Sequence, residues 1–312
     1  MLCCSIQTGL VPVAGTGLAA VTVRIPRVRE AILDVRPFPV ANDTPEIVRG
    51  PDAASAPVQT APPPERLISV AIASRWLGET RGLTIYLPPP GPAPLPMPQP
   101  LPVFYLADNL AAKFAPIMEA AVLAGRSPPA ILVGIDAAKP LAGPCTGLAC
   151  DRRGPEYKID MSGGDTSAAS PFGKHLRFVI DEVIPYIEDH YPASARREDR
   201  IIGGSSNGGH WALIAAALRP DLFGKVMALS ASGRPAAAQA PALANTKLYG
   251  SGGLFEPVYL GNTLGAIAAA HDAGAQTRTY TVVAGHSQVA WEIMFADGAP
   301  WLLMNAPPPP PP

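Results

Sequence analysis

One serine of the chain lies between glycines in a segment that could supply a catalytic nucleophile. The run Gly204-Ser205-Ser206-Asn207-Gly208 fits G-x-S-x-G, and Ser206 is the only serine in this frame. Apolar residues precede it and an Ala- and Leu-rich run, 211–218, follows it, so we expect a strand, a tight turn and a helix. Such a turn lifts the serine Oγ off the sheet and leaves the Asn207 N–H free to face a developing oxyanion. The alternative is a glycine-rich turn with an incidental serine.

An acid and a histidine follow Ser206 at positions suited to acyl transfer. This chemistry needs a base within hydrogen-bond reach of the serine and an acid that orients the base. Glu256 and His286 each come a few residues after a predicted strand. Because the carboxyl ends of parallel strands gather at one edge of a sheet, we expect both side chains near Ser206. The competing acids are Asp221 in a turn, and Asp272 and Glu292 on predicted helices.

The other four histidines are less well placed for catalysis. His175 and His190 bracket the helix predicted before Ser206, so we expect both to be solvated, and His271 comes late in a helix. His210 lies in the first turn after Ser206 and could line a pocket.

Apolar runs alternate with helical patterns along most of the chain. The predicted strands cover 101–106, 130–135, 225–229, 246–249 and 278–283, besides the one that leads into Ser206. The predicted helices cover 114–124, 176–187, 211–218, 262–273 and 291–304, and Pro185 should kink the second. Solid apolar strands alternating with helices imply an α/β fold, with a mostly parallel sheet covered on both faces. Two further β-prone runs, 67–73 and 83–87, predict a hairpin.

Proline-rich stretches suggest three parts. We expect an extension with a flexible linker over 1–65, one domain over 66–304 and a solvated polyproline tail over 305–312. β-prone residues between 21 and 40 predict one added strand in the extension. The segment 136–173 is too long for a simple connector, so we expect it to form a pocket wall.

Composition argues against several function classes. The net charge is -1 and there is no basic run, so no nucleic-acid partner is expected. The apolar run 10–23 is broken by Pro12 and by Gly and Thr, so no membrane span is expected. It lacks the basic residues of an export signal, and both a cytoplasmic and an exported protein stay possible. Cys3, Cys4, Cys145 and Cys150 lack zinc-ligand spacing, so no metal is expected; Cys145 and Cys150 could be bonded to each other or free.

From Leu67 to Leu303 the sequence resembles the putative-esterase family of α/β-hydrolases, which includes enterochelin esterases and esterase D. Three of the matching pieces contain the candidate triad: Gly204 to Gly209, Gly253-Leu-Phe-Glu256-Pro257, and Gly285-His286-Ser287 followed by Trp291. The other matches are 74–81, Tyr86-Leu-Pro, Tyr105-Leu-Ala-Asp108, Val133-Gly-Ile, Arg153-Gly-Pro-Glu156-Tyr157 and Ile184-Pro-Tyr-Ile187. One departure is Asp108-Asn109, where the family usually has Asp-Gly.

The resemblance implies the α/β-hydrolase fold and hydrolysis of a small-molecule carboxylic ester through an acyl-enzyme, with no cofactor. Ser206 would be the nucleophile, His286 the base and Glu256 the acid. Asn207 and Asn109 would supply the oxyanion donors. The expected substrate-binding residues are Asp108, Arg153, Glu156, His210 and Trp291.

Other interpretations remain open at this point. Arg153 and Glu156 could instead form an ion pair that only orders their loop. The chain could be an acyltransferase similar to mycolyltransferases, or a non-enzymatic module that binds through its proline-rich segments. The sequence does not indicate an oligomeric state.

Overall fold

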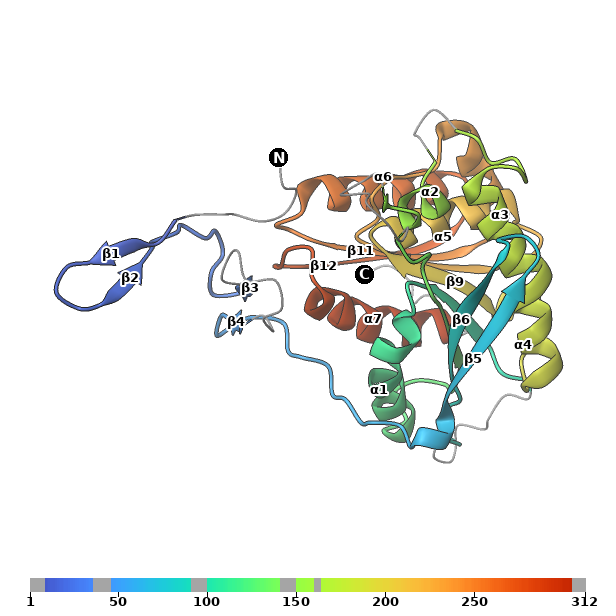
Figure 1. Cartoon of the computed structure of the whole chain (residues 1–312), viewed down its shortest axis with the longest axis horizontal. Helices are drawn as coiled ribbons and strands as arrows, with labels where there is room; N and C mark the ends of the chain where they lie inside the picture. Colours follow the sequence, from blue (N-terminus) through green and yellow to red (C-terminus); the bar gives the residue numbers. More distant parts are fainter. Residues whose placement is uncertain (1–8, 36–45, 91–99, 141–149, 160–163, 305–312) are drawn as a thin grey trace.

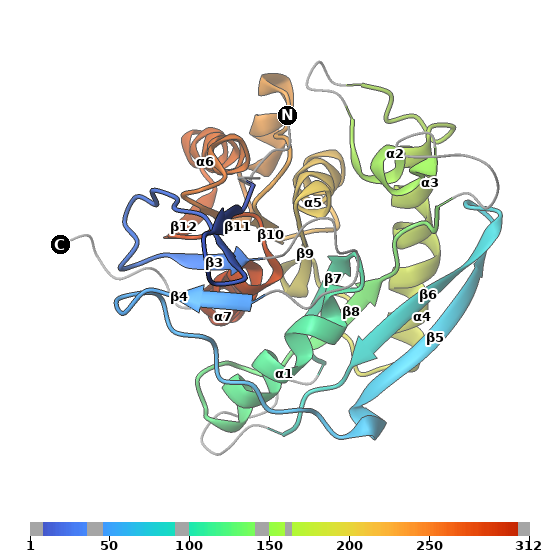
Figure 2. The same ribbon diagram turned by 60° about the vertical axis from the view of Figure 1, so that its left-hand side comes forward.

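A computed structural model describes residues 9–35, 46–90, 100–140, 150–159 and 164–304. The strands of its main sheet are β5 (Leu67–Ser74), β6 (Glu79–Tyr86), β7 (Val103–Ala107), β8 (Ile131–Ile135), β9 (Arg200–Ser205), β10 (Lys225–Leu229), β11 (Lys247–Gly253) and β12 (Gln276–Val282). Their order is β12-β11-β10-β9-β7-β8-β6-β5. In Figure 1, β9 lies between β11 and the β5–β6 pair. Figure 2 shows β5 and β6 at one edge of the sheet and β12 at the other.

Six strands of this sheet are parallel. They run in order from β12 to β8, while β6 pairs antiparallel with both β8 and β5. The central strands β7, β8, β9 and β10 are buried along their whole length, as expected of strands covered on both faces. The predicted α/β architecture with a mostly parallel sheet is therefore confirmed.

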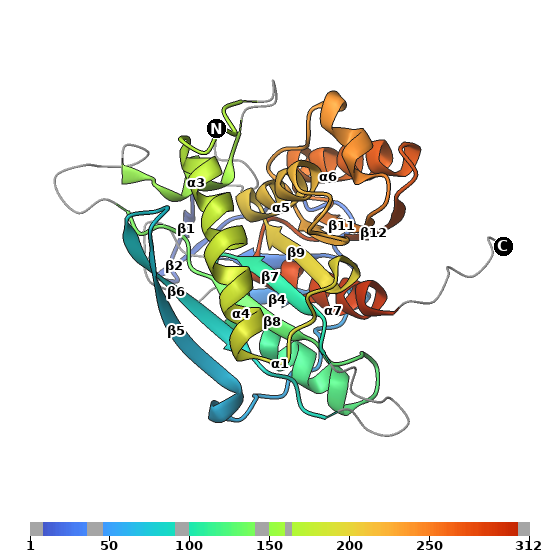
Figure 3. The ribbon, with the colours of Figure 1, turned by 90° about the vertical axis from the view of Figure 1, so that its right-hand side faces the viewer.

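Helices lie on both faces of the sheet (Figure 3). They are α1 (Leu110–Leu123), α2 (Arg153–Tyr157), α3 (Pro171–Phe178), α4 (Ile184–His190), α5 (Asn207–Leu218), α6 (Pro257–Asp272) and α7 (Gln288–Leu303). Short 3-10 turns occur at Pro64–Arg66, Arg197–Asp199 and Ala237–Leu243. One apolar core joins the sheet to α3, α4, α5 and α6, and a second joins it to α1 and α7.

The helix predicted over 176–187 is continuous but changes its winding. A π-helical turn, Val179–Val183, joins α3 to α4, and Pro185 lies in the first turn of α4. Proline has no N–H to donate to the carbonyl four residues earlier, so an altered winding just before it satisfies the backbone at little cost. The structure therefore has a π turn just before Pro185, at the place where the sequence predicts a kink.

Two antiparallel strand pairs precede the main sheet in the chain. β1 (Val11–Val13) pairs with β2 (Leu18–Ala20), and β3 (Ile32–Val35) pairs with β4 (Glu46–Arg49). The Ile32 N–H donates to the Val283 carbonyl oxygen, 2.8 Å away, just beyond β12. The strand predicted between 21 and 40 is thereby confirmed as β3. Its hydrogen bond to Val283 attaches β3 to the residue that directly follows β12.

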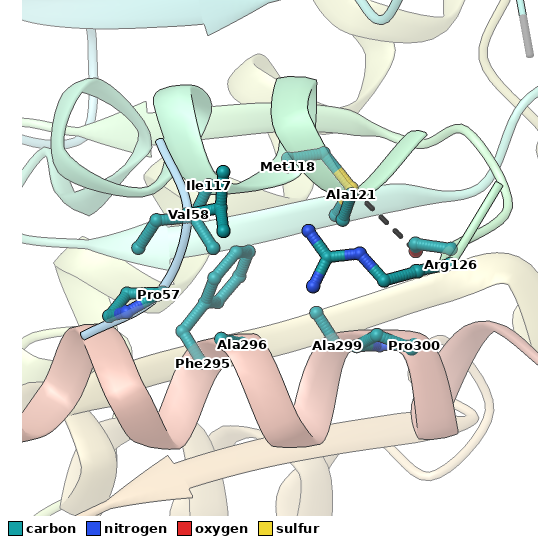
Figure 4. Close-up of a pocket in the computed structure, with 11 residues that line it drawn as sticks. Pro57, Val58, Ile117, Met118, Ala121, Arg126, Phe295, Ala296, Ala299 and Pro300 are labelled. Carbon is teal, nitrogen blue, oxygen red and sulfur yellow. Dashed lines mark hydrogen bonds between the residues drawn. The ribbon is translucent and has the colours of Figure 1, made fainter. Parts of the chain in front are cut away.

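Residues 53–63 have no regular structure, yet they lie along the body. The Thr60 N–H donates to the Pro116 carbonyl oxygen on α1. Pro57 and Val58 cover an apolar groove between α1 and α7, with the Arg126 guanidinium at its rim (Figure 4). The segment predicted to be a flexible linker therefore packs against α1 and α7.

Several sequence features lie partly or wholly outside the described residues. These are the polyproline tail 305–312 and three of the four cysteines, Cys3, Cys4 and Cys145. Cys150 is disulfide-bonded. Among the described residues, no helix combines the length and the apolar character that crossing a bilayer requires.

Candidate active site

Ser206 occupies a sharp turn between β9 and α5. Its backbone has φ 56° and ψ -121°, and its N–H donates to the Leu229 carbonyl oxygen at 2.9 Å. A Cβ on Gly204 would lie 2.6 Å from the Gly208 carbonyl carbon, and one on Gly208 would lie 2.8 Å from the Ala107 Cβ. Both positions therefore require glycine, and positive φ at a serine is the strained geometry expected of a nucleophile elbow. α5 begins directly at Asn207, four residues earlier than its sequence pattern predicts.

Glu256 and His286 form a direct hydrogen bond. His286 Nδ1 lies 2.5 Å from Glu256 Oε2. The other carboxylate oxygen, Oε1, accepts from the Gly253 N–H at 2.6 Å and from the Ser230 hydroxyl at 2.5 Å. Glu256 is 0% exposed. A buried carboxylate is costly without partners, and here both oxygens have them.

These side chains all follow the carboxyl ends of neighbouring parallel strands. Ser206 comes after β9, Ser230 after β10, Glu256 after β11 and His286 after β12. The strands are adjacent in that order in the sheet. Hydrogen bonds link these carboxyl ends of the strands: the Ser206 N–H donates to β10, and the Ser230 hydroxyl donates to Glu256. The structure thus places the candidate nucleophile, base and acid at the carboxyl ends of neighbouring strands, with a direct contact between the acid and the base.

Two aromatic rings hold the His286 imidazole. The Tyr259 ring lies 4.1 Å from it between centroids, and the Trp291 ring packs edge-on at 5.0 Å and 90°. Because an ionised Glu256 can only accept, Nδ1 must carry a proton. In the neutral imidazole, Nε2 then has a free lone pair.

The two expected oxyanion donors differ in their surroundings. Asn207 is the first residue of α5, and N–H groups in a helix's first turn have no acceptor within the helix. The Asn109 N–H, in contrast, donates to the Ile135 carbonyl oxygen at 3.0 Å. The expectation for Asn109 therefore needs correction, since this N–H is already paired. Its neighbour, the Asp108 N–H, has only a long contact of 3.3 Å with the Tyr157 hydroxyl oxygen.

The segment before α3 places α2 beside Asp108. Arg153 binds the Asp108 carboxylate through two hydrogen bonds of 2.5 and 2.6 Å. A Cβ on Gly208 would lie 3.2 Å from Asp108 Oδ2, so this ion pair borders the nucleophile turn. Arg153 also stacks over the Tyr157 ring at 5.1 Å. This part of segment 136–173 therefore reaches the residues that border the candidate nucleophile turn.

Glu156 has a structural place. It is 5% exposed and accepts two hydrogen bonds from Arg81 of β6, at 2.9 and 2.8 Å. The expectation that Glu156 binds substrate is corrected accordingly, because this carboxylate already pairs with a buried guanidinium. The ion pair anchors α2 to the sheet. The partner of Glu156 is Arg81, however, and not Arg153, which the alternative interpretation pairs with it.

Two histidines, His210 on α5 and His175 on α3, are buried. His210 is 3% exposed, and burial lowers its pKa to about 4. His175, expected to be solvated, is 0% exposed and packs against Tyr157 and Trp211. Burial lowers the pKa of His175 to about 3. Both imidazoles are thus neutral at pH 7, whereas His190 is exposed as expected.

The competing acids lie elsewhere. Asp221 is exposed and pairs with Arg219. Asp272 is exposed at the end of α6, and Glu292 accepts from Gln59 and Gln288. Sequence reasoning missed Ser230 and Tyr259, although Ser230 directly follows a predicted strand, 225–229, which is the same signal that singled out Glu256 and His286.

Comparison with known proteins identifies relatives of this fold. Residues 74–302 match the model of the family described as Putative esterase. The chain is similar in structure to the enterobactin esterase of Shigella flexneri, with 20% identity, TM-score 0.66 and coverage of 83% of this chain and 65% of that one. The ferric enterobactin esterase of Salmonella typhimurium is 19% identical, with TM-score 0.64 and coverage of 83% of this chain and 64% of that one. The BES protein of Bacillus cereus is 17% identical, with TM-score 0.57 and coverage of 80% of this chain and 100% of that one.

These similarities confirm the predicted α/β-hydrolase fold. At such identities they speak for the fold alone. The chain spans less than two thirds of the length of either enterobactin esterase. No curated protein sequence matches the chain.

Proposed function

Because the chain belongs to the family described as Putative esterase, we propose that it is a serine hydrolase that cleaves carboxylic esters through an acyl-enzyme. The observation that carries this proposal is the hydrogen bond between the buried Glu256 carboxylate and His286, at the carboxyl ends of the strands that also position Ser206. An acid that orients a histidine, at strand ends next to a serine in a nucleophile elbow, fits what acyl transfer requires.

In the first half-reaction Ser206 is the nucleophile. Its Oγ attacks the ester carbonyl carbon while its proton passes to Nε2 of His286. Glu256 accepts a hydrogen bond from the Nδ1–H group of His286 and stabilises the imidazolium that forms. When the tetrahedral intermediate collapses, the ester C–O bond breaks and the leaving alkoxide takes the proton from Nε2. The product alcohol departs and the acyl group remains on Ser206.

Water completes the cycle through the same groups. His286 Nε2 removes a proton from the water molecule as its oxygen attacks the acyl carbon. The second tetrahedral intermediate expels Ser206 Oγ, which recovers the proton from Nε2. The carboxylic acid leaves, and the enzyme returns to its starting protonation state.

The negative charge of each tetrahedral intermediate needs donors. The Asn207 N–H is supported as the first donor by its position at the start of α5, where the helix dipole also favours an anion. For the second donor we propose the Asp108 N–H, because its contact with Tyr157 is long and the Asn109 N–H is occupied. Loss of one such donor typically costs about 100- to 1000-fold in rate.

We further propose that the substrate is a small-molecule ester bound between the turn and α2. Arg153 and Asp108 border the turn, and His210 follows it by one helical turn. The listed structural relatives include enterobactin esterases and a ferulic acid esterase, which guides the choice of substrates to test.

A substrate panel tests the proposal. Initial rates are measured with p-nitrophenyl esters of increasing acyl length, methyl ferulate and a triscatecholate siderophore, for the wild type and Ser206→Ala. We expect hydrolysis of short activated esters by the wild type alone. Absence of hydrolysis across the panel, with no acyl transfer to an added alcohol, would argue for a binding module instead.

A further inference from the structure

Ser230 occupies an unusual position next to the acid. It directly follows β10, is 0% exposed, and has φ 47°. A positive φ is unfavourable for a serine, so the fold must hold this residue in place. Its N–H donates to the Ser251 carbonyl oxygen at 2.7 Å, which secures the backbone against β11.

The hydrogen bonds of Ser230 have a fixed direction. The Trp291 indole Nε1–H, 3.1 Å from Ser230 Oγ, can only donate. Ser230 therefore accepts from Trp291, and its single hydroxyl proton goes to Glu256 Oε1 at 2.5 Å. Glu256 in turn accepts from His286 through its other oxygen. Each group thus donates to the next, from the Trp291 indole to the Ser230 hydroxyl and from that hydroxyl to the Glu256 carboxylate.

We propose that Ser230 is a positioning residue for the acid, and that the Trp291 indole sets the direction in which Ser230 donates. This inference rests on the proposed function of Glu256 and His286. It reassigns Trp291, expected to bind substrate, to a role behind the catalytic histidine. Ser230 touches neither the substrate nor the reacting atoms; it acts by holding Glu256 Oε1, so that Oε2 stays aimed at Nδ1.

The carboxylate needs this second donor because glutamate is long. A glutamate side chain has three rotatable bonds, and the Gly253 N–H alone would leave the plane of the carboxylate free to turn about that contact. With the Ser230 hydroxyl as well, Oε1 accepts two hydrogen bonds, which restricts rotation of the carboxylate plane. Loss of a hydrogen bond to a charged group corresponds to about a 10- to 100-fold loss of rate.

Ser230→Gly is the most informative variant. Glycine adopts positive φ freely, so this change removes the hydroxyl while relieving backbone strain. We expect kcat to fall about 10- to 100-fold with little change in KM, and the melting temperature to stay within a few degrees of the wild type. Trp291→Phe keeps the ring beside His286 but removes the indole donor. It should lower kcat by less than Ser230→Gly.

A matched control is available at Ser194. This serine is also 0% exposed and also donates to a carboxylate, Asp199 Oδ2 at 2.7 Å, but it precedes β9 at the opposite end of the strand. Ser194→Ala should leave kcat and KM unchanged. An equal loss of kcat in Ser194→Ala would assign the effect to general loosening of the fold and overturn the inference.

A double-mutant cycle separates positioning from any independent effect. If Ser230 acts only through the acid, then adding Ser230→Gly to the Glu256→Gln variant should lower kcat by less than about threefold. Losses that multiply in the double variant would contradict the inference. So would an unchanged kcat in Ser230→Gly when Glu256→Gln is strongly impaired.

The same experiment distinguishes failure of the inference from failure of the proposed function. If Glu256→Gln itself keeps full activity, the acid is misplaced and the proposed function fails in that respect. If Glu256→Gln is impaired while Ser230→Gly is not, the triad stands and only the role of Ser230 is lost.

Discussion

His286 Nδ1 lies 2.5 Å from Glu256 Oε2, across 30 residues of sequence. The contact joins the loops that follow β11 and β12. A Cβ on Gly253 would lie 2.2 Å from the Ala284 carbonyl oxygen, so only glycine lets the two loops approach this closely. Gly253, the last residue of β11, thus lets the backbone seat a glutamate at this distance from His286, whereas a shorter acid would have to start from a nearer backbone.

Glu256→Gln should keep the fold and lower kcat. If the glutamine oxygen accepts from Gly253 and Ser230, its NH₂ group faces Nδ1 of His286. The imidazole must then place its proton on Nε2, where it cannot act as a base. We expect kcat to fall between about 10- and 10,000-fold, the upper figure being the cost of losing the acid in serine proteases. Steady-state kinetics with a p-nitrophenyl ester measures the change.

Asp221→Asn is the control for this variant. Asp221 is an exposed acid between the serine and the histidine in sequence, and its partner is Arg219. Its replacement should leave kcat unaltered. A large drop in Asp221→Asn, with none in Glu256→Gln, would mean that the acid is assigned to the wrong residue.

His286→Ala should reduce kcat about as much as Ser206→Ala. Nucleophile and base act as a unit, so removing the second member after the first costs little. We therefore expect the double variant to match the single variants in kcat for p-nitrophenyl ester hydrolysis. A double variant far slower than either single one would show that the two residues do not work as a pair.

Glu156→Ala should destabilise the protein and disturb α2. It leaves the Arg81 guanidinium, 2% exposed, with Glu79 as its remaining carboxylate partner. Removing one partner of a buried ion pair typically costs about 3–5 kcal/mol in the free energy of unfolding, and Glu79 should keep the loss near the lower figure. Urea denaturation measures it. Asp221→Ala, which breaks an exposed pair, should cost under about 1 kcal/mol. Equal losses in the two variants would show that the buried Arg81–Glu156 pair contributes no more than an exposed pair.

Acid should destabilise the fold through its buried histidines. Burial lowers the pKa of His175 to about 3, whereas in the unfolded chain a histidine titrates near its ordinary value of about 6.5. Between these values the unfolded state binds more protons, so the free energy of unfolding falls as the pH drops from about 6.5 toward 3. His210 adds to this loss down to a pH of about 4.

His175→Phe tests this pH dependence. Neither ring nitrogen of His175 has a hydrogen-bond partner among the described residues, so phenylalanine gives up no bond there. Denaturation at pH 7, 5.5 and 4.5 should show a shallower loss of stability in the variant than in the wild type. Parallel curves for the two proteins would mean that His175 does not take part in acid unfolding.

The sequence predicts the ends of the strands well because their signals are local. An apolar run that stops at a glycine or a polar residue places Ser206, Glu256 and His286 after strands, and parallel strands collect such residues at one edge. β10 begins and ends at the residues its apolar pattern indicates, Lys225 and Leu229. β11 extends to Gly253 because its glycines continue the pairing with β12, a contact that no local pattern reports.

Partners from distant segments account for what the sequence does not predict. Glu156 pairs with Arg81, 75 residues away, and no spacing rule connects them. His175 faces inward because Tyr157 and Trp211 cover that side of α3. The Asn109 N–H is taken by Ile135 because β7 and β8 are neighbours in the sheet. Each of these outcomes depends on how elements pack, which one sequence leaves open.

Covalent labelling tests the central claim most directly. The protein is treated with a fluorophosphonate, and the modified residue is located by peptide mass spectrometry, with Ser206→Ala as the control. We predict a single adduct on Ser206, loss of esterase activity in proportion to labelling, and neither label nor activity in Ser206→Ala. An adduct on Ser205, or full activity in Ser206→Ala, would contradict the assignment of Ser206 as the nucleophile.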